Sequence, residues 1–378
     1  MSGIRVLQLI ASSRGGGASH VRDLALALDR SRFAVQVAMP EDGGNVRPAD
    51  FMGAGGLPFY SLGPVAGNSP TALRRIRHLS AGVDILHMHG ARAAMLGRLA
   101  WLGPARKRPR LVYTFHGFTT PYYAQPRRAA MLMMERMLAG TTDAFIAVCQ
   151  AEREAALAAG ICRPGKVRVV RNGVVVSRFQ LEQPARAAAR TSLGILPTTT
   201  LITTICRLDK PRDFDSLLRA FQQVRESQAD VHCLIVGNGP LWHDLERRVQ
   251  AAPFAGKVSL TGWRQDVPQL YAASDIFTLT TWGWEGMPIS VLEAMAASRP
   301  VVVTDAGGVP EAVTQDETGL LVPRRDAAGL AQAYLSLARD QAMRQRMGQA
   351  GQDRATRLFT ARRVAAEVMA AYDEVVKE

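Results

Sequence analysis

The stretch IRVLQLIASSRGGGASHVRDLALALDRSRFAVQVAMP, residues 4–40, decides the fold. It opens with an apolar run, passes through a glycine-rich turn into a segment with helical spacing, and closes on a second β-branched run. A strand, a helix and a second strand in this order form the βαβ unit of a parallel sheet. Because strands covered on both faces are apolar throughout, these uninterrupted runs predict a buried sheet.

The same alternation continues along the chain. Strand candidates follow at residues 84–90, 111–117, 144–149 and 167–174, separated by helical stretches at 91–102, 127–140 and 151–160. The pattern loosens over residues 177–197, and a second series then gives strand candidates at 201–208, 231–239, 257–263, 275–281, 299–308 and 319–323. We therefore expect an α/β protein of two facing Rossmann-like domains with parallel sheets, residues 1–178 and 195–359. An amphipathic helix at 360–378, with Val364, Val368 and Met369 on one face, joins the first domain.

The composition fits a compact protein of two domains, since 378 residues exceed the usual size of one core and hydrophobic residues make up 47%. The four cysteines form no C-x-x-C pair, which argues against a zinc site or a disulfide framework and favours a reducing cytoplasm. The first apolar run is too short for a signal peptide or a membrane span, so we expect a cytoplasmic protein.

A net charge of +13 predicts attraction to an anionic partner: a phosphorylated small molecule, nucleic acid or an anionic lipid surface. Basic residues cluster at 74–78 and 106–110. A solvated helix face with a basic loop and a membrane contact are two open interpretations of these clusters.

Three loops that follow predicted strands carry the candidate chemistry, because ligands of parallel sheets bind outside the carboxyl ends of the strands. In the first loop, Gly15, Gly16 and Gly17 precede a helix expected near Ala18, whose free amides can bind phosphate. A purely structural turn is the alternative. The G-x-G-x-x-G spacing is missing, which disfavours a nicotinamide cofactor.

The second loop is the most informative. Pro288 suits the first position of a helix, Gly286 permits the turn before it, and the free amides near Ile289 and Ser290 would face an anion. Glu285 and Glu293 would lie roughly 8–12 Å apart at ~1.5 Å per residue, which matches a ligand with a central diphosphate and hydroxyls at both ends.

Carboxylates accept paired hydrogen bonds from vicinal hydroxyls, so one glutamate could hold a ribose and the other a sugar. A helix-end charge at Glu285 and a solvated Glu293 are the alternative, which the apolar neighbours of Glu293 disfavour. The third loop offers Arg207, Lys210 and Arg212 to neutralise a diphosphate, and a surface turn paired with its own aspartates is its alternative.

Taken together, these residues resemble the large retaining family of GT-B glycosyltransferases, group 1 or family four. The most specific match is the E-x7-E pattern within WEGMPISVLEAMAASRPVVVTDAGGVPEAV, residues 284–313. Further matches are RNGV at 171–174, VGNGP at 236–240, GWRQDVP at 262–268 and TGLLV at 318–322, with weaker ones in GGGASHV at 15–21 and TFHG at 114–117. Departures are Arg212 where the family usually has Lys, Cys206 where a glycine often stands, and a longer segment before Glu285.

The resemblance implies roles for these positions. Arg207 and Arg212 would contact the donor diphosphate, with Lys210 as the alternative to Arg212; Glu293 would bind the ribose and Glu285 the hydroxyls of the transferred sugar. His116 would lie near the reacting sugar. The expected catalytic set is His116, Arg207, Arg212 and Glu285, and the expected donor-binding set is Gly15, Gly16, Gly17, Lys210, Gly237, Trp263, Arg264, Gly286, Met287, Pro288, Ile289, Ser290 and Glu293.

We expect a retaining, hexosyltransferase-like enzyme that needs no metal or cofactor. It would move a sugar from a nucleotide-diphosphate sugar, with UDP favoured by family frequency, bound by the second domain, onto a glycan or lipid-linked acceptor at the first. This chemistry serves bacterial polysaccharide, lipopolysaccharide or glycolipid synthesis.

The segment RRAAMLMMERML fits contact with the inner leaflet of the cytoplasmic membrane, although a buried helix packing Met131, Met134 and Leu138 is favoured. Rival functions are a nucleotide-sugar 2-epimerase, a basic nucleic-acid-binding protein, and a non-catalytic binding protein. The E-x7-E segment disfavours the last two, so no nucleic-acid partner is expected.

Overall fold

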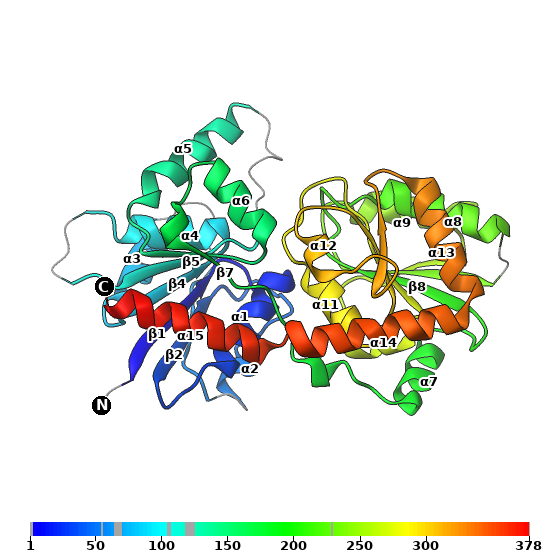
Figure 1. The fold of residues 1–378 in the computed structure, drawn as a ribbon, viewed down its shortest axis with the longest axis horizontal. Coiled ribbons are helices and arrows are strands. Elements are labelled where there is room, and N and C mark those ends of the chain that lie inside the picture. Colours follow the sequence, from blue (N-terminus) through cyan, green and yellow to red (C-terminus); the bar gives the residue numbers. More distant parts are fainter. Residues whose placement is uncertain are drawn as a thin grey trace. The chain divides into compact units, whose positions relative to one another are not determined.

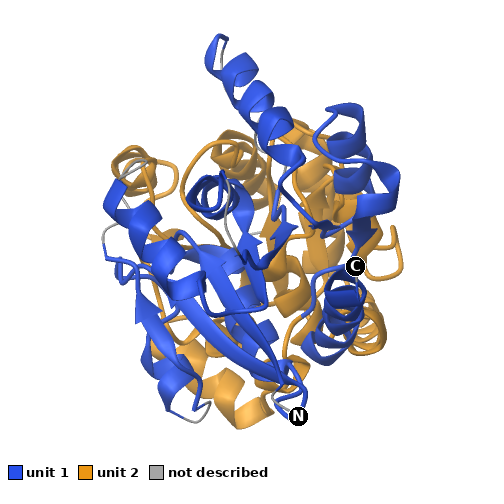
Figure 2. Ribbon diagram, turned by 90° about the vertical axis from the view of Figure 1, so that its left-hand side faces the viewer, with its two compact units in different colours: residues 1–173, 361–378 blue, residues 174–360 orange. Residues whose placement is uncertain are grey.

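The chain is described here from a computed structural model that covers residues 3–53, 56–63, 70–103, 107–117, 125–227 and 230–377 (Figure 1). It divides into two compact units, which Figure 2 shows in separate colours. Unit 1 comprises Met1–Gly173 and Ala361–Glu378, and unit 2 comprises Val174–Thr360. Arg106, part of one predicted basic cluster, lies outside the described residues.

Unit 1 is built on a seven-stranded sheet with the strand order β3-β2-β1-β4-β5-β6-β7, in which every described strand pair is parallel. The strands are β1 (Ile4–Ile10), β2 (Phe33–Met39), β3 (Phe59–Ser61), β4 (Ile85–His89), β5 (Arg110–Thr114), β6 (Ala144–Ala147) and β7 (Val167–Val169). The helices are α1 (Gly15–Ala27), α2 (Ala49–Met52), α3 (Pro70–Ser80), α4 (Gly90–Ala100), α5 (Arg127–Ala139), α6 (Gln150–Ala158), the 3-10 turn η2 (Pro164–Lys166) and α15 (Ala361–Lys377).

Successive residues of β1 explain why this strand is apolar throughout. Val6 belongs to the hydrophobic cluster formed with α1 and α15, whereas Leu7 belongs to the cluster formed with α3 and α4 on the opposite face. Both side chains are fully buried. The sheet is therefore covered on both faces, as the sequence predicts.

The C-terminal helix α15 completes the first of these two clusters. Val364 and Val368 are buried in it, as predicted, and Met369 packs against it. The aromatic ring of Tyr372 is also buried there, 5.7 Å from the ring of Phe33. Residues 361–377 are thus part of the core of unit 1 although they follow unit 2 in the sequence.

Unit 2 has a six-stranded parallel sheet with the order β10-β9-β8-β11-β12-β13. The strands are β8 (Thr200–Ile205), β9 (Val231–Val236), β10 (Val258–Leu260), β11 (Ile276–Leu279), β12 (Val301–Thr304) and β13 (Gly319–Val322). The helical segments are η3 (Val176–Arg178), α7 (Gln183–Ser192), α8 (Phe214–Ser227), α9 (Trp242–Gln250), α10 (Val267–Ala273), α11 (Ile289–Ala296), α12 (Val309–Ala312), α13 (Ala327–Arg339) and α14 (Gln341–Leu358).

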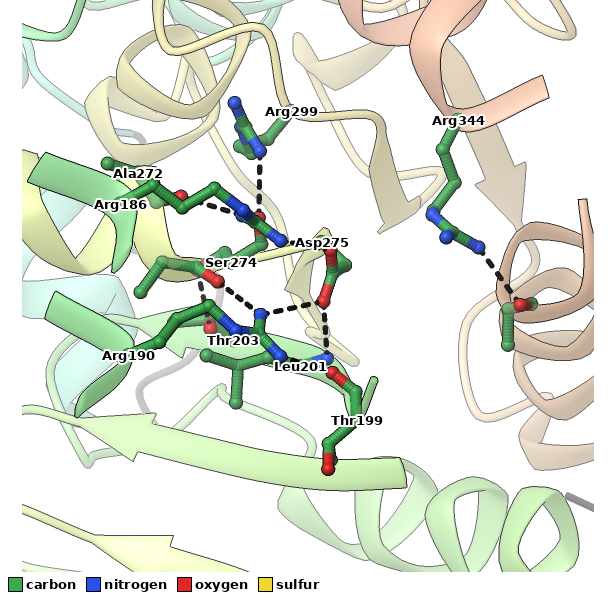
Figure 3. A network of polar contacts seen from close by, with 12 residues as sticks. Arg186, Arg190, Thr199, Leu201, Thr203, Ala272, Ser274, Asp275, Arg299 and Arg344 are labelled. Atoms are coloured by element: carbon green, nitrogen blue, oxygen red, sulfur yellow. Dashed lines mark hydrogen bonds and ion pairs between the residues drawn. The ribbon is translucent and has the colours of Figure 1, made fainter. Parts of the chain in front are cut away.

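The segment in which the sequence pattern loosens forms helix α7, and it groups with unit 2. Two arginines attach α7 to unit 2: Arg186 and Arg190 both contact the carboxylate of Asp275, at 2.5 and 3.1 Å (Figure 3). The same carboxylate accepts the backbone N–H of Leu201 at 2.8 Å, and Arg299 donates to the carbonyl of Ser274 at 2.9 Å. This network lies at the amino ends of β8 and β11, the edge opposite to the ligand-binding edge.

Two expectations about local structure need correction. Strand β3 was not among the strands expected; it has only three half-buried residues and therefore shows no apolar run. Helix α1 begins at Gly15 rather than near Ala18, so all three glycines of the first loop lie in its first turn. Among the described residues, no helix has both the length and the apolar composition needed to cross a membrane.

Candidate functional site

The predicted loops lie at the points where the strand order reverses. In unit 1 the reversal falls between β1 and β4, and in unit 2 it falls between β8 and β11. Open parallel sheets bind ligands outside the carboxyl ends of the strands at such points. The glycine-rich loop follows β1, the arginine loop follows β8, and the loop with Glu285 follows β11. The topology of each unit thus places these loops where a ligand is expected.

In unit 2, Arg212 and Glu285 bind each other. Arg212 Nη1 lies 2.5 Å from Glu285 Oε1, and Arg212 Nη2 lies 3.4 Å from Oε2. Only 18% and 13% of the two side-chain surfaces are exposed. Burial alone would lower the pKa of Arg212, but the carboxylate of Glu285 outweighs this effect and raises it, so the arginine stays charged. The sequence predicted a ligand contact for each residue but not this pairing.

The backbone holds the two loops together next to this ion pair. Arg212 forms an isolated antiparallel bridge with Thr281, and the Thr281 hydroxyl donates to the carbonyl of Pro211 at 3.0 Å. The N–H of Trp282 donates to the same carbonyl at 3.0 Å. The loops after β8 and β11 therefore form one structure, which fixes where the guanidinium and the carboxylate meet.

Glycines after β12 fix the backbone of Glu285. The N–H of Gly308 donates to the carbonyl of Glu285 at 2.9 Å. Gly307 has φ +56°, and a Cβ atom on it would lie 2.0 Å from the same carbonyl oxygen. Only glycine fits this position. Gly307 belongs to the E-x7-E segment, but its pattern predicts no role for it; the Gly-Gly pair after a buried strand is the sequence signal for this contact.

Helix α11 begins one residue later than expected. Pro288 is the N-cap residue, with φ −66° and ψ 122°, rather than the first helical residue. Its carbonyl accepts the N–H of Val291 at 3.2 Å. The amides of Ile289 and Ser290 occupy the first two helical positions, where no intrahelical acceptor is available. These two N–H groups remain the predicted anion-binding donors.

Glu293 has a partner that the sequence analysis missed. The hydroxyl of Tyr271, a fully buried residue, donates to Glu293 Oε2 at 3.0 Å and lies 3.0 Å from the carbonyl of Ser290. Burial, and next the charge of Glu293, raises the pKa of Tyr271 well above its ordinary value, so the phenol keeps its proton. It therefore orients one carboxylate oxygen of Glu293. A tyrosine in the amphipathic run VPQLYAA was the available signal.

The remaining predicted donor residues of unit 2 line the same edge of the sheet. Arg207 is well exposed and pairs with Asp209 at 2.6 Å, the kind of pairing named in the alternative of a surface turn. Lys210 is exposed. Gly237 packs so closely that a Cβ atom would lie 1.9 Å from the carbonyl oxygen of Cys206. Its N–H donates to Gly262 at 2.8 Å, which brings the loop before Trp263 and Arg264 to this edge.

In unit 1, the loop after β2 holds the glycine-rich loop. Asp42 accepts the N–H of Ser13 at 3.1 Å, and Asn45 accepts the N–H of Gly15 at 2.5 Å. Gly15 has φ +79°, a conformation that favours glycine. Asp42 and Asn45 did not enter the sequence analysis, because their role depends on the pairing of β1 with β2.

His116 lies in a cluster of histidines. Its Nε2 is 2.9 Å from His89 Nδ1, and its ring contacts the ring of His20 edge-on with the centroids 4.6 Å apart. Ligand atoms of these three residues all lie within 4.8 Å of one another, a spacing at which they could hold one metal ion. Burial lowers the pKa of His20 to about 4, and burial followed by the neighbouring histidines lowers the pKa of His116 well below its ordinary value.

Solved structures share this fold. HepE of Anabaena in complex with UDP and glucose superimposes with a TM-score of 0.85 at 21% identity, covering 98% of this chain and 100% of that one. WaaG, a glycosyltransferase involved in lipopolysaccharide biosynthesis, superimposes with a TM-score of 0.74 at 15% identity over 97% and 99% of the two chains. The two parallel α/β units therefore form a GT-B fold, as predicted.

Sequence comparisons define the family. The Glycosyltransferase Family 4 model matches residues 14–178, and the Glycosyl transferases group 1 model matches residues 199–340. Phosphatidyl-myo-inositol mannosyltransferase of Mycobacterium leprae is 30% identical over 373 residues, 96% of this chain and 93% of the relative. UDP-Gal:alpha-D-GlcNAc-diphosphoundecaprenol alpha-1,3-galactosyltransferase of Escherichia coli is 28% identical over 268 residues, 69% and 67% of the two chains. The chain belongs to the group 1 glycosyltransferases.

Proposed function

We propose that this glycosyltransferase moves a sugar, with retention of configuration, from a nucleotide-diphosphate sugar onto an acceptor hydroxyl. One observation carries the proposal: the edge of unit 2 that includes the helix terminus at Ile289 also presents the Arg212–Glu285 pair and Glu293. Cationic and amide donors suit the diphosphate, and carboxylates suit the hydroxyls of the ribose and the sugar. In this proposal unit 2 binds the donor and unit 1 binds the acceptor.

The roles follow from the hydrogen bonds that are already in place. The short Nη1–Oε1 bond keeps Arg212 and Glu285 together, while the longer contact of 3.4 Å leaves Nη2 able to meet a phosphate oxygen and Oε2 able to meet a sugar hydroxyl. Tyr271 orients one oxygen of Glu293, the carboxylate that this proposal assigns to the ribose. Arg207 and Lys210 supply further positive charge as the diphosphate leaves.

Two substitutions test these roles separately. Glu293→Ala should weaken donor binding by about 10- to 100-fold, because a carboxylate that accepts two hydroxyls contributes about 1.5–3 kcal/mol. Arg207→Ala should mainly lower kcat, by about 10²–10³-fold. Arg247→Ala is the matched control, since Arg247 is also exposed and paired with an aspartate but lies on α9. Full turnover by the Arg207 variant would refute the role assigned to that arginine.

The donor and the stereochemistry are tested with the unmodified chain. We propose a UDP-sugar; the relative from Escherichia coli is named for UDP-Gal, whereas a relative from Mycobacterium tuberculosis is named as GDP-mannose-dependent. A panel of UDP- and GDP-sugars, read by thermal shift and product formation, should favour UDP. Turnover should persist in EDTA, and NMR of the product should show the anomeric configuration of the donor. Sugar interconversion with donor alone would instead indicate an epimerase.

Helix α5 supports a lipid-linked acceptor at a membrane surface. Met133, Met134 and Met137 are 63%, 40% and 72% exposed and share one face with Ala130, at helical spacing. The favoured expectation was a buried helix that packs Met131, Met134 and Leu138. It is wrong for Met134, which is exposed; only Leu138 is buried. Figure 1 shows α5 projecting from the body of unit 1.

The chemistry of this face fits an anionic bilayer. Helix α5 also carries exposed arginines at positions 127, 128 and 136, and the chain has a net charge of +13. The double substitution Met133→Ser and Met137→Ser should reduce sedimentation with vesicles of anionic lipid, whereas Met52→Ser, at another exposed methionine, should not. Equal binding by the double variant and the unmodified chain would contradict this part of the proposal.

A further inference from the structure

The histidines of unit 1 belong to a longer chain of hydrogen bonds that runs through its core. The chain begins at His116, whose Nε2 lies 2.9 Å from His89 Nδ1. It continues from His89 Nε2 to Gln8 Oε1 at 2.7 Å, and from Gln8 Nε2 to the Tyr372 hydroxyl at 2.8 Å. His87 extends it, with Nδ1 2.6 Å from the same hydroxyl and Nε2 2.7 Å from Thr114 Oγ1.

The amide of Gln8 gives this chain a direction. The amide nitrogen of Gln8 donates to the Tyr372 hydroxyl, so the amide oxygen faces His89. An amide oxygen only accepts hydrogen bonds, so the proton in this bond is carried by His89 Nε2. A neutral imidazole carries one proton, so His89 Nδ1 has a lone pair. The hydrogen bond between His89 and His116 then requires the proton on His116 Nε2.

Burial keeps every member of the chain neutral. The side chains of Gln8, His87 and His89 are 0–2% exposed. Burial lowers the pKa of His87 to about 3 and that of His89 well below its ordinary value, and it raises the pKa of Tyr372. At neutral pH each ring is therefore neutral and carries one proton, so the tautomers of His89 and His116 follow from the hydrogen bonds.

We propose that His89, oriented by Gln8 and Tyr372, is the positioning residue for His116. It holds the His116 ring in the Nε2–H tautomer, which leaves Nδ1 as a hydrogen-bond acceptor. The backbone of His116 has φ +58°, an uncommon conformation for a residue other than glycine, so the ring needs such an anchor. The edge-on ring of His20 limits its rotation from another side.

This assignment defines what His116 can bind. An Nδ1 lone pair accepts a hydrogen bond from a hydroxyl group and repels an ionised phosphate oxygen, which has no proton to donate. His116 therefore selects a sugar hydroxyl rather than the diphosphate. This last step rests on the proposed function, whereas the tautomer does not.

The tautomer can be measured directly on the full chain labelled with ¹⁵N-histidine. Two-dimensional ¹⁵N–¹H NMR should show His116, assigned by the loss of its signals in His116→Phe, protonated at Nε2 at neutral pH. His89→Leu should give a mixture of His116 tautomers, with kcat about 10- to 100-fold lower. His89→Asn should restore the Nε2–H tautomer and most of kcat, because its carboxamide oxygen can occupy the position of Nδ1.

Two controls separate positioning from folding. His78→Leu, at an exposed histidine of α3, should change neither the signals of His116 nor kcat. Tyr372→Phe keeps the buried ring but frees Gln8 to rotate, and it should also mix the tautomers. Protonation of His116 at Nδ1 in the unmodified chain, or His116 signals that are unchanged in both His89→Leu and Tyr372→Phe, overturns the proposal. If no donor is turned over, the proposed function fails while the spectrum still decides the tautomer.

Discussion

Acidification from pH 8 to pH 5 should destabilise unit 1 through its buried histidines. The pKa values of His20 and His87 are about 4 and about 3 in the folded chain, because burial disfavours their charged forms, against 6.5 for an exposed imidazole. At pH 5 the unfolded chain binds protons at both residues and the folded chain does not, so stability falls as the pH drops below 6.5. With a pKa of about 6.5 in the unfolded chain, His20 and His87 each lower the free energy of unfolding at pH 5 by about 2 kcal/mol, or about 4 kcal/mol together.

Native-state hydrogen exchange measures this loss unit by unit. The free energy of opening for the amides of β4 (Ile85–His89) should fall by at least about 4 kcal/mol between pH 8 and pH 5, after correction for intrinsic exchange rates, because the lowered pKa values of His89 and His116 add to the loss. The amides of β12 (Val301–Thr304) in unit 2 serve as the internal reference. Carboxylates remain ionised over most of this range and contribute little. A loss below about 1 kcal/mol in β4, or an equal loss in β12, would refute the reasoning.

Two further predictions concern unit 2. Asp275→Asn should lower the free energy of unfolding by about 3–5 kcal/mol in urea titrations, because it leaves two arginines of α7 buried without their counter-charge; a loss below about 1 kcal/mol would contradict the role given to this network. Gly307→Ala should weaken donor binding at least about 10-fold, since its Cβ would collide with the carbonyl of Glu285 and move that residue. Calorimetry with UDP-sugar tests this, and Gly165→Ala, at a position with open space, is the control.

The fold could be predicted from the sequence because the signal is local. Buried parallel strands are continuous apolar runs, and β1, β4, β6, β7 and β9 to β13 lie within the predicted stretches, whereas β8 begins one residue before its stretch. Helix α5 (Arg127–Ala139) matches the predicted stretch 127–140 to within one residue. Two kinds of feature were not predicted correctly. One is a short edge strand such as β3; the other is the exact start of a helix, as at Gly15 and Pro288, where one hydrogen bond decides the boundary.

The site was predicted as a set of residues but not as a set of contacts. The Arg212–Glu285 pair joins residues 73 positions apart, and Gln8 and Tyr372 are 364 positions apart. Such pairings depend on strand order, which no local pattern contains. One signal was available: His87 and His89 are two positions apart in a predicted strand, so both side chains point to the same face of the sheet.

The return of α15 to unit 1 has a consequence for the order of events during synthesis. Unit 2 is a continuous segment, Val174–Thr360, and has all its residues before α15 is made. The core of unit 1 stays open until Tyr372 and Val375 have left the ribosome. Although domains usually form in order from the amino end, the later unit of this chain can mature first, while the earlier one waits for its final helix.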